Sequence, residues 1–188
     1  MDLFPLWNSL RIAAIASVAV FFSGILLAYY VARLPRVLKG LLDVALTLPL
    51  VLPPTVCGWF LLLLFGRNHP VGRWLGQWGF QFVMTWYGGV LAAAVVAFPL
   101  MYRTARGAFE SFDETLAWSG KTLGLSNTYI FWRIRMPACR QGILAGAVLA
   151  FARALGEYGA TSMLIGYTPG RTATISTTVY QLWRTNDD

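Results

Sequence analysis

The sequence predicts an all-α fold, a polytopic transmembrane helical bundle of about four spans. Of its 188 residues, 57% are hydrophobic and only 12% are charged, whereas a soluble domain carries about 25% charged residues. A bilayer core requires roughly 20 apolar residues per helix. Four segments supply such a run: Leu10 to Val31, Leu41 to Phe65, Trp86 to Tyr102, and Gly142 to Tyr167.

Lysine and arginine residues set the expected orientation, because cytoplasmic loops carry an excess of them. The basic loops after the first and third spans are placed inside. The loop after the second span, the tail and therefore the N-terminus are placed outside. The inside loops hold Arg33, Arg36 and Lys39, then Arg103, Arg106, Lys121, Arg133, Arg135 and Arg140; the outside segments hold Arg67 and Arg73, then Arg171 and Arg184 with the terminal Asp187 and Asp188.

The net charge of +7 is spread between apolar runs and does not form one basic stripe. Anionic lipid head groups are therefore the expected partner, and nucleic acid is not. Cys57 lies in an apolar run and Cys139 in a basic loop, so both are interpreted as structural. His69 has no second ligand at a useful spacing, which argues against a metal site.

Three prolines, Pro49, Pro53 and Pro54, interrupt the second expected span. Each removes a backbone donor and clashes with the preceding turn, so we expect the helix to break or kink there. Irregular backbone at membrane depth is tolerated only where protein or a watery cavity satisfies its polar groups. A packing kink and an element that lines a transport pathway are equally good readings of this pattern.

The fourth expected span contains Arg153 and Glu157, which a continuous helix would place on one face. A charge near the bilayer centre costs about 2.5 to 3.5 kcal/mol, so a mutual or cross-subunit ion pair is expected. Structural and functional interpretations of this pair weigh equally. Gly156 and Gly159 weaken the helix beside the glutamate and allow another backbone to approach.

The same span begins with a stripe of small residues, Gly142, Gly146 and Ala150, at helical spacing. Such a stripe suits close helix contact. Packing within one chain explains it adequately, and a dimer seam is the alternative.

The loop 105–140 contains a second helical pattern between Gly124 and Pro137. Apolar side chains recur at three- and four-residue steps, and the helix is expected to stop before Pro137. Such an amphipathic helix either lies on the membrane surface or inserts into a groove of a partner. Its composition does not distinguish these two possibilities. The apolar face consists of Leu125, Tyr129, Trp132 and Met136.

Gly120, Lys121 and Thr122 look like the end of a phosphate-binding loop. That motif requires a glycine five residues before Gly120, and Thr115 stands there. No Ser/His/Asp or Cys/His set occurs in the sequence either. We therefore expect neither an ATP site nor catalysis in this chain.

The loop resembles a motif of bacterial ABC-importer permeases: Glu-Ala-Ala, three residues, Gly, nine residues, then Ile-x-Leu-Pro. Gly124 matches the glycine, and Ile134 to Pro137 match the end. The Glu-Ala-Ala positions hold Trp118, Ser119 and Gly120, so the acidic residue of the motif is absent. Glu114, one helical turn earlier, is the candidate substitute.

Two further stretches, 48–58 and 149–161, resemble molybdate permeases, and sulfate and tungstate permeases share parts of them. The resemblance implies a permease subunit in the bacterial inner membrane that moves molybdate. It also implies two copies of a separate ATPase subunit that bind ATP and Mg, with no cofactor in this chain. A second permease copy, forming a homodimer, and a periplasmic oxyanion-binding protein complete the implied assembly.

The resemblance also implies roles for individual residues. The helix that begins near Gly124 would seat in a groove of the ATPase, and the proline break with the charged face of the fourth span would line the pathway. The implied coupling residues are Gly124, Leu125, Tyr129, Trp132, Ile134, Met136 and Pro137. The implied pathway residues are Pro49, Pro53, Pro54, Arg153 and Glu157.

Residues 1–188 are expected to form a single transmembrane domain with 105–140 as its cytoplasmic coupling loop. Such permeases typically have another span after the region that matches 168–184, so we expect a chain truncated at its C-terminus. Alternatives are a permease for sulfate, tungstate or another oxyanion, and a membrane scaffold that moves no solute. An autonomous channel is disfavoured because no span has a continuous polar face.

Overall fold

A computed structural model describes residues 3–185, and its regular structure is helical. Helices α1 (Phe4–Val31) and α5 (Trp86–Glu110) are each long and apolar enough to cross a membrane. Two bent pairs bring the total to four spans if each pair counts as one: α2 (Arg36–Val51) with α3 (Pro54–Phe65), and 127–138 with α9 (Arg140–Leu155). The predicted polytopic helical bundle is confirmed.

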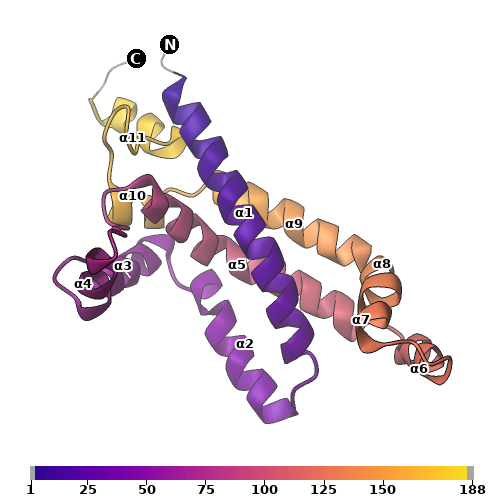
Figure 1. Cartoon of the computed structure of the whole chain (residues 1–188). Coiled ribbons are helices and arrows are strands. Elements are labelled where there is room, and N and C mark those ends of the chain that lie inside the picture. Colours follow the sequence, from indigo (N-terminus) through magenta and orange to yellow (C-terminus); the bar gives the residue numbers. More distant parts are fainter. Residues whose placement is uncertain (1–2, 186–188) are drawn as a thin grey trace.

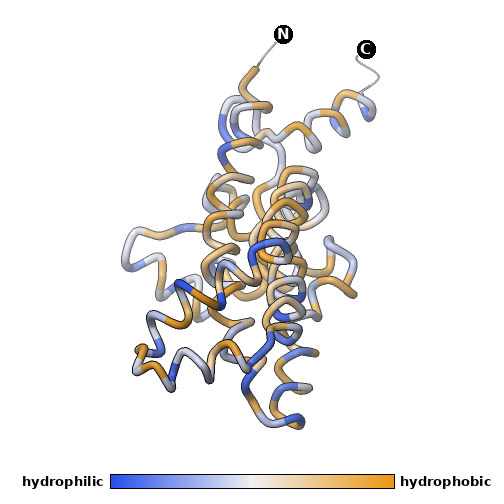
Figure 2. Tube along the Cα trace, turned by 90° about the vertical axis from the view of Figure 1, so that its right-hand side faces the viewer, coloured by the Kyte–Doolittle hydropathy of each residue, from blue (hydrophilic) through white to orange (hydrophobic). Residues whose placement is uncertain are grey.

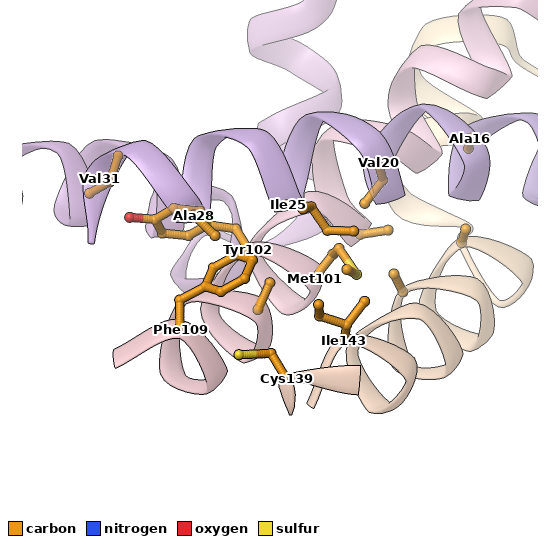
Figure 3. Close-up of a cluster of buried hydrophobic side chains, with 14 of the residues drawn as sticks. Ala16, Val20, Ile25, Ala28, Val31, Met101, Tyr102, Phe109, Cys139 and Ile143 are labelled. Carbon is orange, nitrogen blue, oxygen red and sulfur yellow. The ribbon is translucent and has the colours of Figure 1, made fainter. Parts of the chain in front are cut away.

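The centre of the bundle is the crossing of α1, α5 and α9 (Figure 1). Met101 and Tyr102 of α5 are fully buried there and lie beside Val20, Ile25 and Ala28 of α1 (Figure 3). A Cβ at Gly24 would lie 2.8 Å from Met101 Cγ, so only glycine allows α1 this close to α5. Figure 2 shows that hydrophobic residues dominate these central helices, with hydrophilic residues gathered in the loops and towards the ends.

The small-residue stripe of α9 faces α5 of the same chain. A Cβ at Gly142 would lie 2.7 Å from Ala108 Cβ, and one at Gly146 would lie 3.1 Å from Met101 Sδ. Ala150 is buried in the same cluster. Packing within one chain therefore accounts for the stripe.

The second span breaks at Pro53 and Pro54, and the chain bends by 111° between α2 and α3. Leu52 and Pro53 adopt extended ψ angles of 141° and 136°, because a residue that precedes proline is disfavoured in the helical region. Pro54 then begins α3, a position that requires no N–H donor. The expected break is thus present, although Pro49 stays inside α2 and does not cause it.

The fourth span is not the single helix expected over Gly142 to Tyr167. Helix α9 ends at Leu155, and α10 (Gly159–Ile165) begins after a short non-helical stretch. Glycines at 156 and 159 flank this break, and among the amino acids only proline weakens a helix more than glycine does.

Shorter helices complete the described part of the chain. Helix α4 (Pro70–Gln77) follows His69. Helix α5 continues beyond the expected Tyr102 to Glu110, so the loop 105–140 begins as helix. The rest of that loop holds α6 (Glu114–Thr122), α7 (Asn127–Ile130), the π-helix η1 (Phe131–Arg135) and α8 (Met136–Ala138).

The tail carries α11 (Ile175–Thr185) and packs against the beginning of α1. Asn8 Nδ2 donates to the Ala173 carbonyl at 2.9 Å, and the Ile175 N–H donates to Ser9 Oγ at 2.9 Å. The beginning of α1 and helix α11 therefore lie at the same end of the bundle (Figure 1). The terminal Asp187 and Asp188 lie outside the described residues.

Candidate functional site

The breaks of the second and fourth spans meet in space. A Cβ at Gly159 would lie 2.9 Å from Pro54 Cβ and 3.0 Å from the Thr55 nitrogen, and one at Gly58 would lie 2.7 Å from Ala160 Cα. The backbones of α3 and α10 are thus in direct contact, which glycine alone permits. Two of the sequence-predicted pathway segments, 53–54 and 153–157, are therefore brought together.

Glu157 lies inside the break of the fourth span, beyond the end of α9. Its side chain is 1% exposed, and its carboxylate accepts from Arg153 Nη1 at 2.5 Å and from the Ala160 N–H at 2.7 Å. The ion pair thus forms within the chain, although not on the face of one continuous helix as expected. Glu157 also caps the first turn of α10, which stabilises a free helix N-terminus.

Arg153 is the cationic side chain of this junction. Its side chain is 29% exposed, and Glu157 is the only acceptor for its guanidinium among residues 3–185. Guanidinium groups bind oxyanions through paired N–H donors. Because Glu157 neutralises the local charge, such a contact would be weak, and a site on a conduction path must release its ion.

Pro49 lies in the last turn of α2, four residues before Pro53. It lines an apolar cavity of about 260 Å³ between α1, α2 and α5, with Val20 and Phe98 among its neighbours. Its carbonyl accepts from Cys57 Sγ at 3.8 Å, and Cys57 lies in α3 next to Gly58. Pro49 is therefore connected to the junction through Cys57.

The turn at Gly124 connects α6 to α7. Its φ is +77°, a left-handed conformation that side chains with a Cβ rarely adopt. The N–H groups of Gly124 and Leu125 donate to the Lys121 and Gly120 carbonyls at 2.9 and 3.0 Å. Ser126 Oγ then accepts from the Tyr129 N–H and caps α7. The backbone therefore makes a tight turn into α7 at Gly124, the glycine of the motif.

Pro137 does not end the helix that follows, which corrects the sequence-based expectation. The chain continues through α8 to Ala138. A proline in an α-helix loses a hydrogen bond and clashes with the carbonyl four residues earlier. The helix widens to a π-helix over 131–135 immediately before Pro137, and this wider turn relieves the conflict.

The inward face of this segment differs from the predicted one. Ile130 is buried, and it lies against Gly120 of α6 together with Ile134. Tyr129 and Trp132 are instead 48% and 57% exposed. The predicted apolar face is therefore divided, because packing against α6 buries the Ile130 and Ile134 side of the segment. Leu125 and Met136 are half-buried against the core.

Glu114 and Arg135 join the two ends of the coupling loop. Arg135 is 4% exposed, and its Nη1 and Nη2 donate to Glu114 Oε1 and Oε2, both at 2.7 Å. Its Cζ stacks 4.3 Å from the Phe112 ring. The hydrogen bonds from Arg135 lower the pKa of Glu114 from its ordinary value. Trp118, at the acidic position of the motif, is 62% exposed.

Glu114→Gln is expected to destabilise the coupling loop by about 1 kcal/mol at neutral pH, a value discounted because Glu114 is half exposed and screened. Because the pKa of Glu114 is lower in the folded than in the unfolded chain, its carboxylate stabilises the folded protein at pH values above the unfolded pKa of about 4.3. This stabilisation is lost as the pH falls through the folded pKa. Thermal unfolding of both proteins in detergent should therefore differ at pH 7 and converge below about pH 4. A difference that persists at the lowest pH would contradict the role of this carboxylate.

A charge cluster between α2 and α5 escaped the sequence analysis. The Tyr102 hydroxyl donates to Asp43 Oδ1 at 2.5 Å, Arg106 pairs with Asp43, and Lys39 pairs with Glu110. No residue of α2 is buried, so these pairs are a substantial part of its attachment to the bundle. The available signal was Asp43, the only charged residue in Leu41 to Phe65, since a charge within a span is a functional hypothesis by default.

Comparison with known proteins places this architecture among transport proteins. Residues 21–183 match the family described as binding-protein-dependent transport system inner membrane component. The molybdenum transport system permease protein ModB of Escherichia coli (strain K12) is 44% identical, over 96% of this chain and 81% of the relative. The putative molybdenum transport system permease protein YvgM of Bacillus subtilis (strain 168) is 39% identical, over 94% and 78%. The sulfate transport system permease protein CysW of a Synechocystis species is 32% identical, over 86% and 58%.

The family match runs from Phe21 in α1 through the broken spans and the loop 105–140 into α11. The apolar helices agree with a multi-pass protein of the inner membrane. The chain belongs to the family of binding-protein-dependent transport system inner membrane components.

Proposed function

We propose that this chain is the permease subunit of an ATP-binding-cassette importer that moves molybdate across the bacterial cytoplasmic membrane. The carrying observation is the contact between the two broken spans, with a partly exposed guanidinium at the junction. Broken helices at a substrate site are a recurring feature of transporters. The relatives named for molybdenum transport support the choice of molybdate.

The coupling loop is proposed to lie in the cytoplasm, with the N-terminus outside. Two copies of a separate ATPase would hold ATP and Mg, and this chain would contribute no cofactor and no ATPase site. Tyr129 and Trp132, exposed on the segment after Gly124, are the side chains best placed to enter a groove of the ATPase. Ile130 and Ile134 anchor the same segment to α6.

Two contacts connect this docking segment to the spans. The Glu114–Arg135 pair joins the segment to α6, directly after α5. The Asp43–Arg106 pair then joins α5 to α2, whose other end is the proline break. Movement of the coupling loop would therefore reach the junction of the two broken spans through charge-paired helices.

The full assembly is proposed to contain two permease copies and a periplasmic binding protein that delivers the anion. Each copy would present Arg153 beside the shared pathway. Because the Arg153–Glu157 pair is locally neutral, it would contact the anion without holding it tightly, and substrate choice would rest mainly with the binding protein.

A sulfate permease is the second candidate, because a relative named for sulfate transport is 32% identical to this chain. Uptake of labelled molybdate by cells that express the complete system separates the two. An excess of unlabelled molybdate or tungstate is expected to suppress uptake of the label. The same concentration of sulfate is expected to leave most of that uptake intact. Suppression by sulfate as strong as that by molybdate would reassign the substrate.

A further inference from the structure

An apolar groove runs along α1 beside the coupling loop, and of its lining residues only Trp132 and Met136 have a role in the import mechanism proposed above. Its cavity measures about 630 Å³ and is lined mainly by aromatic and aliphatic side chains. Those of α1 are half-buried or exposed to the surroundings of the bundle, except for the buried Ile25, and the opposite wall comes from η1. The principal lining residues are Phe21, Phe22, Ile25, Leu26, Phe131 and Trp132.

The groove is as long as one leaflet of a membrane. Helix α1 rises about 15 Å from Phe21 to its end at Val31, at 1.5 Å per residue. The hydrocarbon core of a bilayer is about 30 Å thick, so one leaflet contributes about 15 Å. With the coupling loop inside, as proposed above, this groove lies in the cytoplasmic leaflet.

The end of the groove beyond Val31 is polar. Arg33, Asn127 and Thr128 line the same cavity and are exposed. Arg33 stacks 3.9 Å over the Tyr29 ring, but it forms no ion pair within residues 3–185. The side chains of Asn127 and Thr128 form no hydrogen bond within the same described range. Arg33, whose charge also acts on the Glu114 carboxylate, therefore stands with Asn127 and Thr128 at the level of the lipid head groups.

We propose that this groove binds one anionic phospholipid of the cytoplasmic leaflet. An acyl chain lies along α1 between Phe22 and Phe131, and the phosphate is held by Arg33 with Asn127 and Thr128. A guanidinium and a phosphodiester are complementary in charge and in donor geometry. A zwitterionic lipid would bring its own cation towards Arg33, so the site favours a head group with net negative charge.

Native mass spectrometry of the purified full chain tests this site. The chain in mild detergent is given equal amounts of dioleoyl phosphatidylglycerol and dioleoyl phosphatidylcholine, and the fraction that retains one lipid is measured. The wild type is expected to retain phosphatidylglycerol preferentially. Arg33→Gln should reduce that retention about fivefold, the value of one basic residue near an anionic surface. Arg36→Gln is the matched control, since Arg36 is exposed but does not line the groove, and it should leave retention unchanged.

A second variant tests the acyl-chain part of the site. Leu26→Trp places a larger side chain in the groove and should reduce retention of phosphatidylglycerol, whereas Leu64→Trp, on the exposed surface of α3, should not. Equal retention of both lipids by the wild type, or equal losses in Arg33→Gln and Arg36→Gln, would overturn the proposal. A photocrosslinker at position 26 that joins a second copy of the chain in place of lipid would also overturn it. Lipid retention and crosslinking are both measured without ATP or substrate, so a negative result in either leaves the import proposal untouched.

Discussion

Replacing Glu157 by glutamine is expected to abolish most transport. The change leaves the Arg153 guanidinium without its charge partner at a break within the membrane and weakens the cap of α10. Breaking a buried ion pair costs about 3 to 5 kcal/mol, and the lower end applies because Arg153 is 29% exposed. Uptake of labelled molybdate should therefore fall more than tenfold, together with the yield of assembled permease.

The double variant Arg153→Met with Glu157→Gln separates the structural from the transport role of this pair. Removing both charges eliminates the unpaired guanidinium, so assembly should recover towards the wild-type yield. Uptake should remain low, because the exposed guanidinium is then absent from the junction. Normal uptake and normal assembly in Glu157→Gln would refute the role of the ion pair.

Replacing Gly124 by valine is expected to weaken recovery of the ATPase subunit while the permease stays in the membrane. A β-branched residue at φ +77° costs about 1 to 2 kcal/mol or more. No atom lies within 4 Å of the Cβ that would be added, so the effect comes from the backbone and not from a clash. Co-purification of the ATPase through a tag on the permease should fall about 5- to 30-fold.

Gly124→Asn and Gly107→Val provide the matched controls. Asparagine tolerates the left-handed conformation and should retain most of the binding. Gly107 also has open space around its missing Cβ but lies within α5 at an ordinary helical φ, so valine there should leave ATPase recovery nearly unchanged. Unchanged recovery in Gly124→Val would refute the docking role of this turn.

The spans and the position of the second break could be predicted because both depend on local chemistry. Long apolar runs are forced into helices by the lack of water in the bilayer core, and Pro53–Pro54 cannot continue a helix. The turn at Gly124 also depends on local chemistry, since a left-handed turn requires a glycine.

Features that depend on tertiary contacts could not be read from the sequence. The break after Leu155 was missed because Gly156 and Gly159 weaken a helix without necessarily ending it, and here the close approach of α3 to α10 decides the outcome. The inward face of the segment after Gly124 consists of Ile130 and Ile134 and not of Tyr129 and Trp132, because packing against α6 decides which of two apolar faces is buried. The Asp43 cluster joins helices distant in sequence, so only its charge in an apolar run was visible.

Uptake of labelled molybdate into proteoliposomes tests the central claim most directly. The permease is reconstituted alone, with the ATPase subunit, or with both the ATPase and the periplasmic binding protein, each with and without ATP and Mg. Accumulation is expected only in the complete set with ATP. Molybdate entry through the permease alone would indicate an autonomous channel, and the absence of entry in the complete set would contradict a role in molybdate import.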